Sequence, residues 1–187
     1  MEYKESSNRT KKVVVICSSP RKNGNSEILA DLFIKGAQEA GHPTEKVRLS
    51  DYEIGYCKAC YYCREHLACC QKDDANLLME KLLSADVLVF ATPIYFFEMS
   101  GQLKVFLDRT MPAYFSEYHF RDVYLLATSL EQAQASMDGA IKGLQGWIDC
   151  FEGSRLAGVV YGTGAGLPGT VRETEAVKKA YEMGRNI

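Results

Sequence analysis

Several features that define large classes of proteins are missing from this sequence. None of its apolar runs approaches the ~20 residues of a membrane-spanning helix. Lys and Arg number 22 against 24 Asp and Glu, so there is no general basic surface for nucleic acid. The opening segment 1–11 is polar and lacks the apolar core of a signal peptide. We therefore expect a cytoplasmic protein that binds neither membrane nor nucleic acid, with a frayed tail over 1–11.

The motifs of two common nucleotide-binding folds are also missing. No segment carries the Gly-Lys-Ser/Thr ending of a Walker loop. Gly162-Thr-Gly-Ala-Gly166 is rich in glycine but does not match GxGxxG, because position 167 is Leu167 and the segment follows the last predicted strand. We interpret 162–166 as a closing turn that touches a ligand or a neighbouring subunit.

What is present is a regular alternation of strand-like and helix-like segments, with an average apolar content of 47%. This alternation predicts a three-layer, doubly wound α/β domain over 12–187 with five parallel strands. The predicted strands are 12–17, 46–49, 87–91, 123–127 and 156–161. The predicted helices are 25–40, one that includes 77–83, one over 103–110, 133–151 and 171–183.

The first predicted strand leads into a polar loop, Ser18-Ser-Pro-Arg-Lys-Asn-Gly-Asn-Ser26, which we call the first loop. The four β-branched residues of 13–16 indicate a strand buried on both faces, and a helix begins at Asn25 or Ser26. The free N–H groups and the dipole of a helix N-terminus attract anions. Hydroxyls, an amide and the guanidinium of Arg21 are suitable phosphate ligands. We predict a phosphate site here, in preference to an ordinary polar turn.

The loop predicted after the third strand, 92–99, contains Tyr95-Phe96-Phe97. Three consecutive aromatic residues in a loop cover either the core or a ligand, and backbone N–H groups near Ile94 and Tyr95 can face a planar ring. The alternative interpretation is a hydrophobic lid or a subunit contact. We favour contact with a ligand, because in a doubly wound sheet this loop lies beside the first loop.

Five of the seven cysteines lie between Cys57 and Cys70. In a reducing compartment such clustering indicates metal or redox chemistry before a disulfide framework. Thiolates spaced two residues apart can surround one [4Fe–4S] cluster or one zinc ion, and they can equally remain free thiols packed in the loop. The four candidate ligands are Cys57, Cys60, Cys63 and Cys69. The two cysteines outside the group, Cys17 and Cys150, are expected in the core.

These motifs together resemble a known family. The first loop, Thr92-Pro-Ile-Tyr-Phe96 and Gln102–Arg109 resemble the NADPH-dependent FMN reductases of flavodoxin-like fold. The four-cysteine spacing, followed by 73–74, resembles the iron–sulfur flavoprotein branch of that family. The resemblance covers nearly the whole chain from Lys12 onward and implies the sheet order 2-1-3-4-5.

The resemblance also assigns residues to an FMN site. It implies that the FMN phosphate is held by Ser18, Arg21, Asn25 and Ser26. Other residues of the first loop shape it or contribute to the cofactor site, namely Ser19, Pro20, Asn23 and Gly24. The isoalloxazine ring is lined by Pro93, Ile94, Tyr95 and Phe96. The loop 128–131 lacks the glycines expected of the family, so its role at the flavin stays open.

The function implied by the resemblance is an NAD(P)H-dependent, FMN-containing reductase of flavin, a quinone or a small electrophile. The alternatives are an iron–sulfur flavoprotein in one-electron transfer to an electron carrier, and a flavin-binding redox sensor without turnover. No catalytic acid–base pair is predicted, because the flavin supplies the hydride chemistry. The resemblance further implies a homodimer or homotetramer, and it does not decide between NADH and NADPH.

Overall fold

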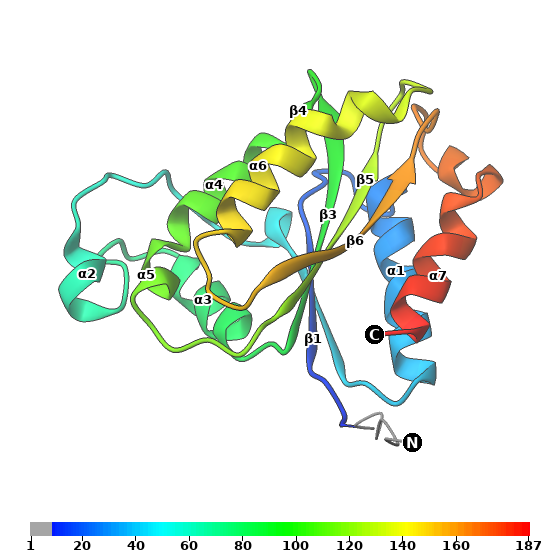
Figure 1. Cartoon of the computed structure of the whole chain (residues 1–187). Helices are drawn as coiled ribbons and strands as arrows, with labels where there is room; N and C mark the ends of the chain where they lie inside the picture. The colour runs from blue at the N-terminus through cyan, green and yellow to red at the C-terminus, as the bar shows by residue number, and fades with distance from the viewer. Residues whose placement is uncertain (1–8) are drawn as a thin grey trace.

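One sheet between two layers of helices forms the molecule (Figure 1). The computed structural model describes residues 9–187, so the tail predicted over 1–11 lies outside the described residues except at its last three positions. The strands are β1 (Val13–Cys17), β2 (Thr44–Arg48), β3 (Val87–Tyr95), β4 (Glu98–Met99), β5 (Asp122–Thr128) and β6 (Arg155–Gly162). The α-helices are α1 (Asn25–Glu39), α2 (Tyr62–His66), α3 (Ala75–Leu83), α4 (Gly101–Arg109), α5 (Met111–Tyr114), α6 (Asp138–Ile148) and α7 (Ala176–Arg185).

The five long strands are parallel and follow the order β2-β1-β3-β5-β6. This is the predicted order, since β5 and β6 are the fourth and fifth long strands along the chain. Val13 of β1 pairs with Thr44 on one side and with Val87 on the other, which places β1 inside the sheet. None of the described helices is long and apolar enough to cross a membrane.

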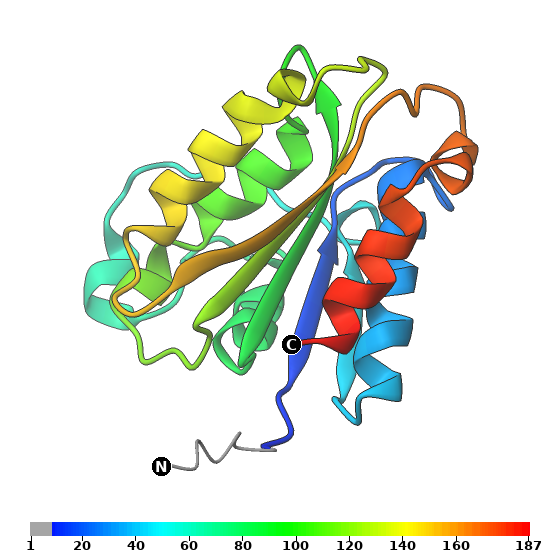
Figure 2. The same ribbon diagram turned by 45° about the vertical axis from the view of Figure 1, so that its right-hand side comes forward.

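Alternate residues of the strands supply two separate cores. On β1, Val14 and Ile16 pack with the core under α3, α4 and α6, whereas Val13 and Val15 pack with the core under α1 and α7. The two helical layers are visible on either side of the twisted sheet in Figure 2. All five residues of β1 are buried, as expected for a parallel strand covered on both faces.

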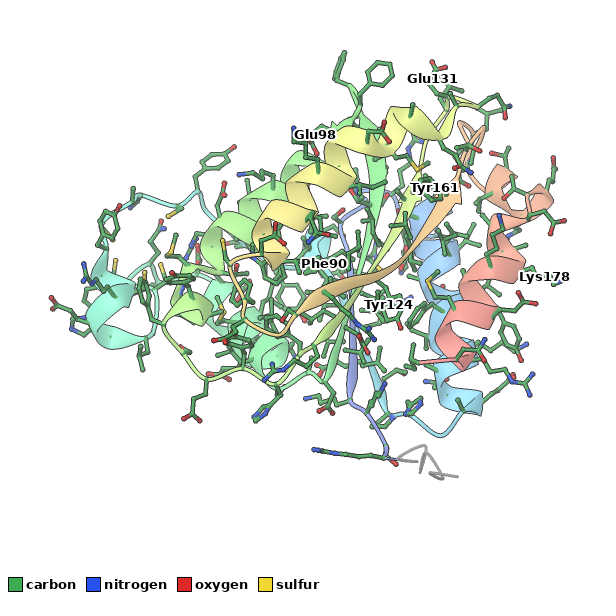
Figure 3. All side chains as sticks on the ribbon, viewed as in Figure 1. Phe90, Glu98, Tyr124, Glu131, Tyr161 and Lys178 are labelled. Atoms are coloured by element: carbon green, nitrogen blue, oxygen red, sulfur yellow. The ribbon has the colours of Figure 1, made fainter. Side chains whose placement is uncertain are left out.

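Two glycines let α1 and α7 pack against each other at backbone distance. A methyl group at Gly184 would overlap the carbonyl oxygen of Phe33, and one at Gly36 would overlap the carbonyl oxygen of Tyr181. Phe33 is fully buried beneath this contact and packs on Tyr124, whose side chain lies between the sheet and these helices (Figure 3). The sequence does not reveal this close approach, because a glycine within a helix does not indicate which segment packs against it.

Three predicted segments differ from the structure. The loop predicted for 92–99 is wrong, because β3 continues to Tyr95 and pairs with β4 as an antiparallel hairpin. The helix predicted over 133–151 is shorter, because a 3₁₀ turn (Gln134–Met137) precedes α6. Within this turn, the buried Ser136 donates to the hydroxyl of Ser129. The helix predicted over 171–183 is likewise preceded by a 3₁₀ turn (Thr170–Glu173).

We expect Gly184→Ala to lower the free energy of unfolding by about 2 kcal/mol, because overpacking against a backbone forces the two helices apart. Gly146→Ala is the matched control. Gly146 also lies within a helix, and an added methyl group meets no atom within 4 Å. The control is therefore expected to raise stability by about 0.5–1 kcal/mol through helix propensity. Urea unfolding of both variants measures the contrast, and equal stabilities would contradict the packing described here.

Candidate functional site

A large cavity lies where the parallel strands end. Its volume is about 540 Å³, which falls within the range of cofactor sites. The loops after β1, β3, β5 and β6 form its walls, and Glu131 (labelled in Figure 3) lies on its edge. In doubly wound sheets the ligand binds at this place, where neighbouring loops turn in opposite directions. We refer to it as the main cavity.

The first loop supplies a polar wall of the main cavity with one unsatisfied group. The hydroxyl of Ser26 is buried and has no hydrogen-bond partner within residues 9–187. A buried hydroxyl without a partner is costly, so this group is available to a ligand. A side chain at Gly24 would come within 3.0 Å of the hydroxyl of Ser19, which keeps the loop tight. The residues of this wall are Ser19, Arg21, Gly24, Asn25 and Ser26.

Three predicted residues of the first loop lie outside the cavity lining, namely Ser18, Pro20 and Asn23. The hydroxyl of Ser18 donates to the carbonyl oxygen of Ala91 at 3.2 Å and accepts from the hydroxyl of Ser100 at 2.8 Å. Asn23 has a φ of 56°, and its N–H donates to the carboxylate of Glu27 at 2.7 Å. These contacts fix the shape of the loop.

Asn25 lines the main cavity, but its side-chain amide also joins two distant loops. Its nitrogen donates to the carbonyl oxygens of Ala165 and Leu167 at 2.7 and 2.8 Å. Its oxygen accepts the N–H of Gly169 at 2.8 Å and that of Val171 at 3.4 Å. The amide predicted to contact phosphate therefore fixes the loop after β6 against the start of α1.

The hairpin between β3 and β4 turns through Phe96 and Phe97, and we call residues 95–98 the aromatic turn. Both central residues have positive φ, 51° and 64°, as a type I′ turn requires. Asn and Gly favour this conformation, and a bulky residue adopts it at a cost of ~1–3 kcal/mol. Phe96 is fully exposed, so the turn does not cover the core. Both rings border the main cavity, together with Pro93, Ile94 and Tyr95.

The prediction from sequence missed part of the main cavity. The lining residues to which the sequence assigns no contact are Thr128, Ser129, Leu130, Glu131 and Ser136. Phe97, Ala165 and Gly166 lie in the two segments, 95–97 and 162–166, for which a ligand contact is expected. The loop 128–131 follows β5 and the segment 165–166 follows β6. The signal that identifies them is topological, because the carboxyl ends of all the parallel strands meet at one edge of the sheet.

Five cysteines surround a second, smaller cavity of about 120 Å³, the cysteine cavity. They are Cys57, Cys60, Cys63, Cys69 and Cys70, and sulfur atoms gather around α2 in Figure 3. Three non-glycine residues of this loop have positive φ, namely Ala59, Tyr61 and Leu67, and such strain is typical of functional loops. Within the described chain, no three potential ligands converge as a single-ion site.

The two remaining cysteines have different environments. Cys17 is buried in β1 as predicted, and desolvation raises the pKa of its thiol to about 12, which makes it unreactive. The core position predicted for Cys150 is wrong. Helix α6 ends at Ile148, and Cys150 is exposed beyond that end with its thiol directed at the carbonyl oxygen of Gly146.

Arg109 borders the cysteine cavity and forms a partly buried ion pair with Asp73. Arg109, at the end of α4, donates to both carboxylate oxygens of Asp73 at 2.6 and 2.8 Å. The same guanidinium donates to the carbonyl oxygen of Gly55 at 2.6 Å and to the sulfur of Cys69 at 3.2 Å. The hydrogen bonds from Arg109 lower the pKa of Asp73 from 3.8 to about 2. The pair thus joins the cysteine loop, residues 52–72, to α4.

A parallel sheet with a polar loop after its first strand and an aromatic-lined cavity at its carboxyl edge is the arrangement typical of mononucleotide-binding α/β proteins. The model of the NADPH-dependent FMN reductase family matches residues 11–165. The chain therefore belongs to this family, as the sequence motifs predicted, and is an NAD(P)H-dependent, FMN-containing oxidoreductase.

Named relatives agree with the predicted iron–sulfur flavoprotein branch. An iron–sulfur flavoprotein of Archaeoglobus fulgidus is 30% identical over 188 residues, covering 94% of this chain and 78% of that protein. An iron–sulfur flavoprotein of Methanosarcina thermophila is 36% identical over 100 residues. This match covers 54% of this chain and 52% of that protein, about half of its length. The NAD(P)H:quinone oxidoreductase from Methanothermobacter marburgensis superposes with a TM-score of 0.74 at 20% identity, covering 95% and 96% of the two chains. That likeness shows the shared fold.

We expect Asp73→Asn to lower the free energy of unfolding by up to about 2 kcal/mol at pH 6. A carboxyl whose pKa is depressed on folding stabilises the protein above its unfolded value of 3.8, and this stabilisation is lost as the pH falls through about 2. The difference in free energy of unfolding between wild type and Asp73→Asn, measured by urea unfolding, should therefore decrease from pH 6 towards pH 2.

Asp74→Asn is the matched control for this ion pair. Asp74 accepts the N–H of Glu53 at 2.7 Å, and asparagine keeps an acceptor oxygen at that position. We expect a change in the free energy of unfolding of less than about 0.5 kcal/mol at pH 6. A gap between Asp73→Asn and wild type that is independent of pH would contradict the role of the Arg109–Asp73 pair.

Proposed function

We propose that FMN binds in the main cavity with its phosphate on the first loop and its ring beside the aromatic turn. The observation that carries this proposal is the buried hydroxyl of Ser26 at the N-terminus of α1, which has no hydrogen-bond partner in the part of the chain that the structure describes, with Arg21 on the same wall. A phosphate there accepts hydrogen bonds from hydroxyls, from the guanidinium and from the helix N–H groups. Ser18, Ser19, Pro20, Asn23, Gly24 and Asn25 hold the loop in this shape.

The chain's own residues bind and orient the cofactor. Bound FMN supplies the hydride and electron chemistry. Pro93, Ile94 and the aromatic rings of 95–97 form an apolar wall that orients the flavin ring and excludes water from one side of it. The electron donor is NAD(P)H, and the acceptor is a quinone, a free flavin, another small electrophile or an electron carrier.

The cysteine cavity is proposed to hold a [4Fe–4S] cluster on Cys57, Cys60, Cys63 and Cys69. Four thiolates form the soft donor set that iron–sulfur clusters require. The strained backbone around Ala59 and Tyr61 and the names of the relatives support this assignment over zinc or free thiols. With a cluster, the protein takes part in one-electron transfer between the flavin and an electron carrier.

The proposed assembly is a homodimer or homotetramer in the cytoplasm. Exposed apolar side chains border the main cavity, among them Phe96, Phe97 and Leu130. Such a rim is typical of an interface between subunits. Free cysteines persist in the reducing conditions of the cytoplasm.

We expect Arg21→Ala to weaken FMN binding at least tenfold and to leave riboflavin binding unchanged. Riboflavin has the same ring without the phosphate, and a charge-assisted hydrogen bond contributes ~1.5–3 kcal/mol. Quenching of flavin fluorescence on titration measures both affinities. Lys22→Ala removes a neighbouring charge that does not line the cavity, and it should leave both affinities unchanged. Equal losses for FMN and riboflavin would place the phosphate elsewhere.

We expect Cys60→Ser to lose most of the iron and sulfide of anaerobically purified protein while it retains FMN. Wild type should carry ~4 irons per chain with a brown absorption band. Cys150→Ser is the control, since that exposed cysteine lies outside the cysteine loop, and it should keep wild-type iron. Unchanged iron in Cys60→Ser, or zinc in place of iron, would refute the cluster.

A further inference from the structure

Cys69 is held differently from the other cysteines of its loop. Its sulfur accepts a hydrogen bond from the guanidinium of Arg109 at 3.2 Å. Its backbone N–H donates to the side-chain oxygen of Asn76 at 2.8 Å, and its carbonyl oxygen accepts from the side-chain nitrogen of Asn76 at 2.9 Å. Both the backbone and the sulfur of Cys69 are therefore fixed. Cys57 and Cys60, by contrast, are exposed.

The guanidinium that contacts Cys69 cannot move freely. The side chain of Arg109 is only 1% exposed, and Asp73 and Gly55 hold it through three hydrogen bonds. A two-point contact with a carboxylate fixes both the position and the plane of an arginine. A guanidinium is not deprotonated in proteins, so the positive charge of Arg109 is permanent. Within residues 9–187, Cys69 is the only cysteine whose sulfur accepts from a cation.

We infer that Arg109 is a positioning residue for the cluster, acting through Cys69. This inference depends on the cluster proposed above. It assigns two effects to the Arg109–Asp73 pair. The pair holds Cys69 in position before the cluster binds, and it places a buried positive charge beside the sulfur of this ligand. Reduction adds one electron to a cluster, and hydrogen bonds and positive charge at a ligand sulfur favour that reduced form. Arg109 therefore raises the reduction potential of the cluster and leaves that of the flavin unchanged.

The test is a spectroscopic redox titration of holoprotein, followed by the cluster and flavin signals separately. We expect Arg109→Gln to shift the reduction equilibrium of the cluster at least tenfold towards the oxidised form, ~59 mV for a one-electron couple. The flavin midpoint should not change. Lys72→Gln is the matched control, since it removes an exposed charge three residues from Cys69, where solvent screens it.

Arg109→Lys separates charge from geometry. It keeps the positive charge but loses the planar fork, so its cluster potential should fall between those of wild type and Arg109→Gln. Iron content and circular dichroism are measured on the same samples. A folded Arg109→Gln protein that contains FMN but much less iron than wild type would also support the assignment, through the loss of the pre-set ligand.

Two results overturn the inference in different ways. If Arg109→Gln and Arg109→Lys are folded, carry wild-type iron and titrate at the wild-type potential, Arg109 has no positioning role and the cluster proposal stands. If wild type itself binds no iron after anaerobic reconstitution, the cluster proposal fails, and the role of Arg109 fails with it. Should Arg109→Gln not fold, the potential of Arg109→Lys decides, and an unchanged value counts against the inference.

Discussion

A buried pair of hydroxyls is the contact on which both cavities depend. Ser100 donates to the hydroxyl of Ser18 at 2.8 Å, and the N–H of Ser100 donates to Thr92 at 3.0 Å. All three side chains are buried, so none of these bonds can be exchanged for bonds to water without cost. The first loop begins at Ser18 and the aromatic turn lies between Thr92 and Ser100. The two walls of the main cavity are thus fixed to each other by polar contacts beneath them.

The same serine begins the helix that reaches the cysteine cavity. Ser100 is the N-cap of α4 and accepts the N–H of Leu103, and the nine residues of α4 span ~13 Å before ending at Arg109. Because Leu103 and Phe106 are buried against the sheet, α4 is a rigid spacer between the two sites. The cysteine loop contributes few buried side chains of its own. Its position relative to the main cavity is therefore set largely by Arg109, Asp73 and Asn76.

Whether a structural feature can be predicted from the sequence depends on how far apart in the chain its interacting residues lie. The β-branched run of β1 and the polar residues before α1 are local signals, and they predicted the strand, the first loop and the start of the helix correctly, although the N-cap is Gly24 and not Asn25 or Ser26. The hairpin after β3 was missed because Phe96-Phe97 is not a turn-forming pair, and its positive φ angles are imposed by β4 and the surroundings. Asn25 and Ala165 are 140 positions apart, so no local pattern reveals that this amide joins two loops. Arg109 ends the family motif Gln102–Arg109, but nothing in its local sequence indicates the contacts with Asp73 and Cys69 that the fold creates.

The two cavities differ in how their walls are anchored, and this difference follows from the fold. Every loop around the main cavity follows a strand end, so the ladder of the sheet anchors it. Ser18 and Asn25 join the first loop to the loops after β3 and β6, and Ser129 joins the loop after β5 to Ser136 and Ala165. The cysteine cavity has one rigid side, formed by the end of α4 and by Cys69, and one side formed by an exposed loop with strained residues such as Ala59 and Tyr61. A metal cluster contributes folding energy to the ligands it gathers. In the proposed holoprotein this folding energy stabilises the exposed loop side of the cysteine cavity. The side formed by Arg109 and Cys69 is already held by packing and charge.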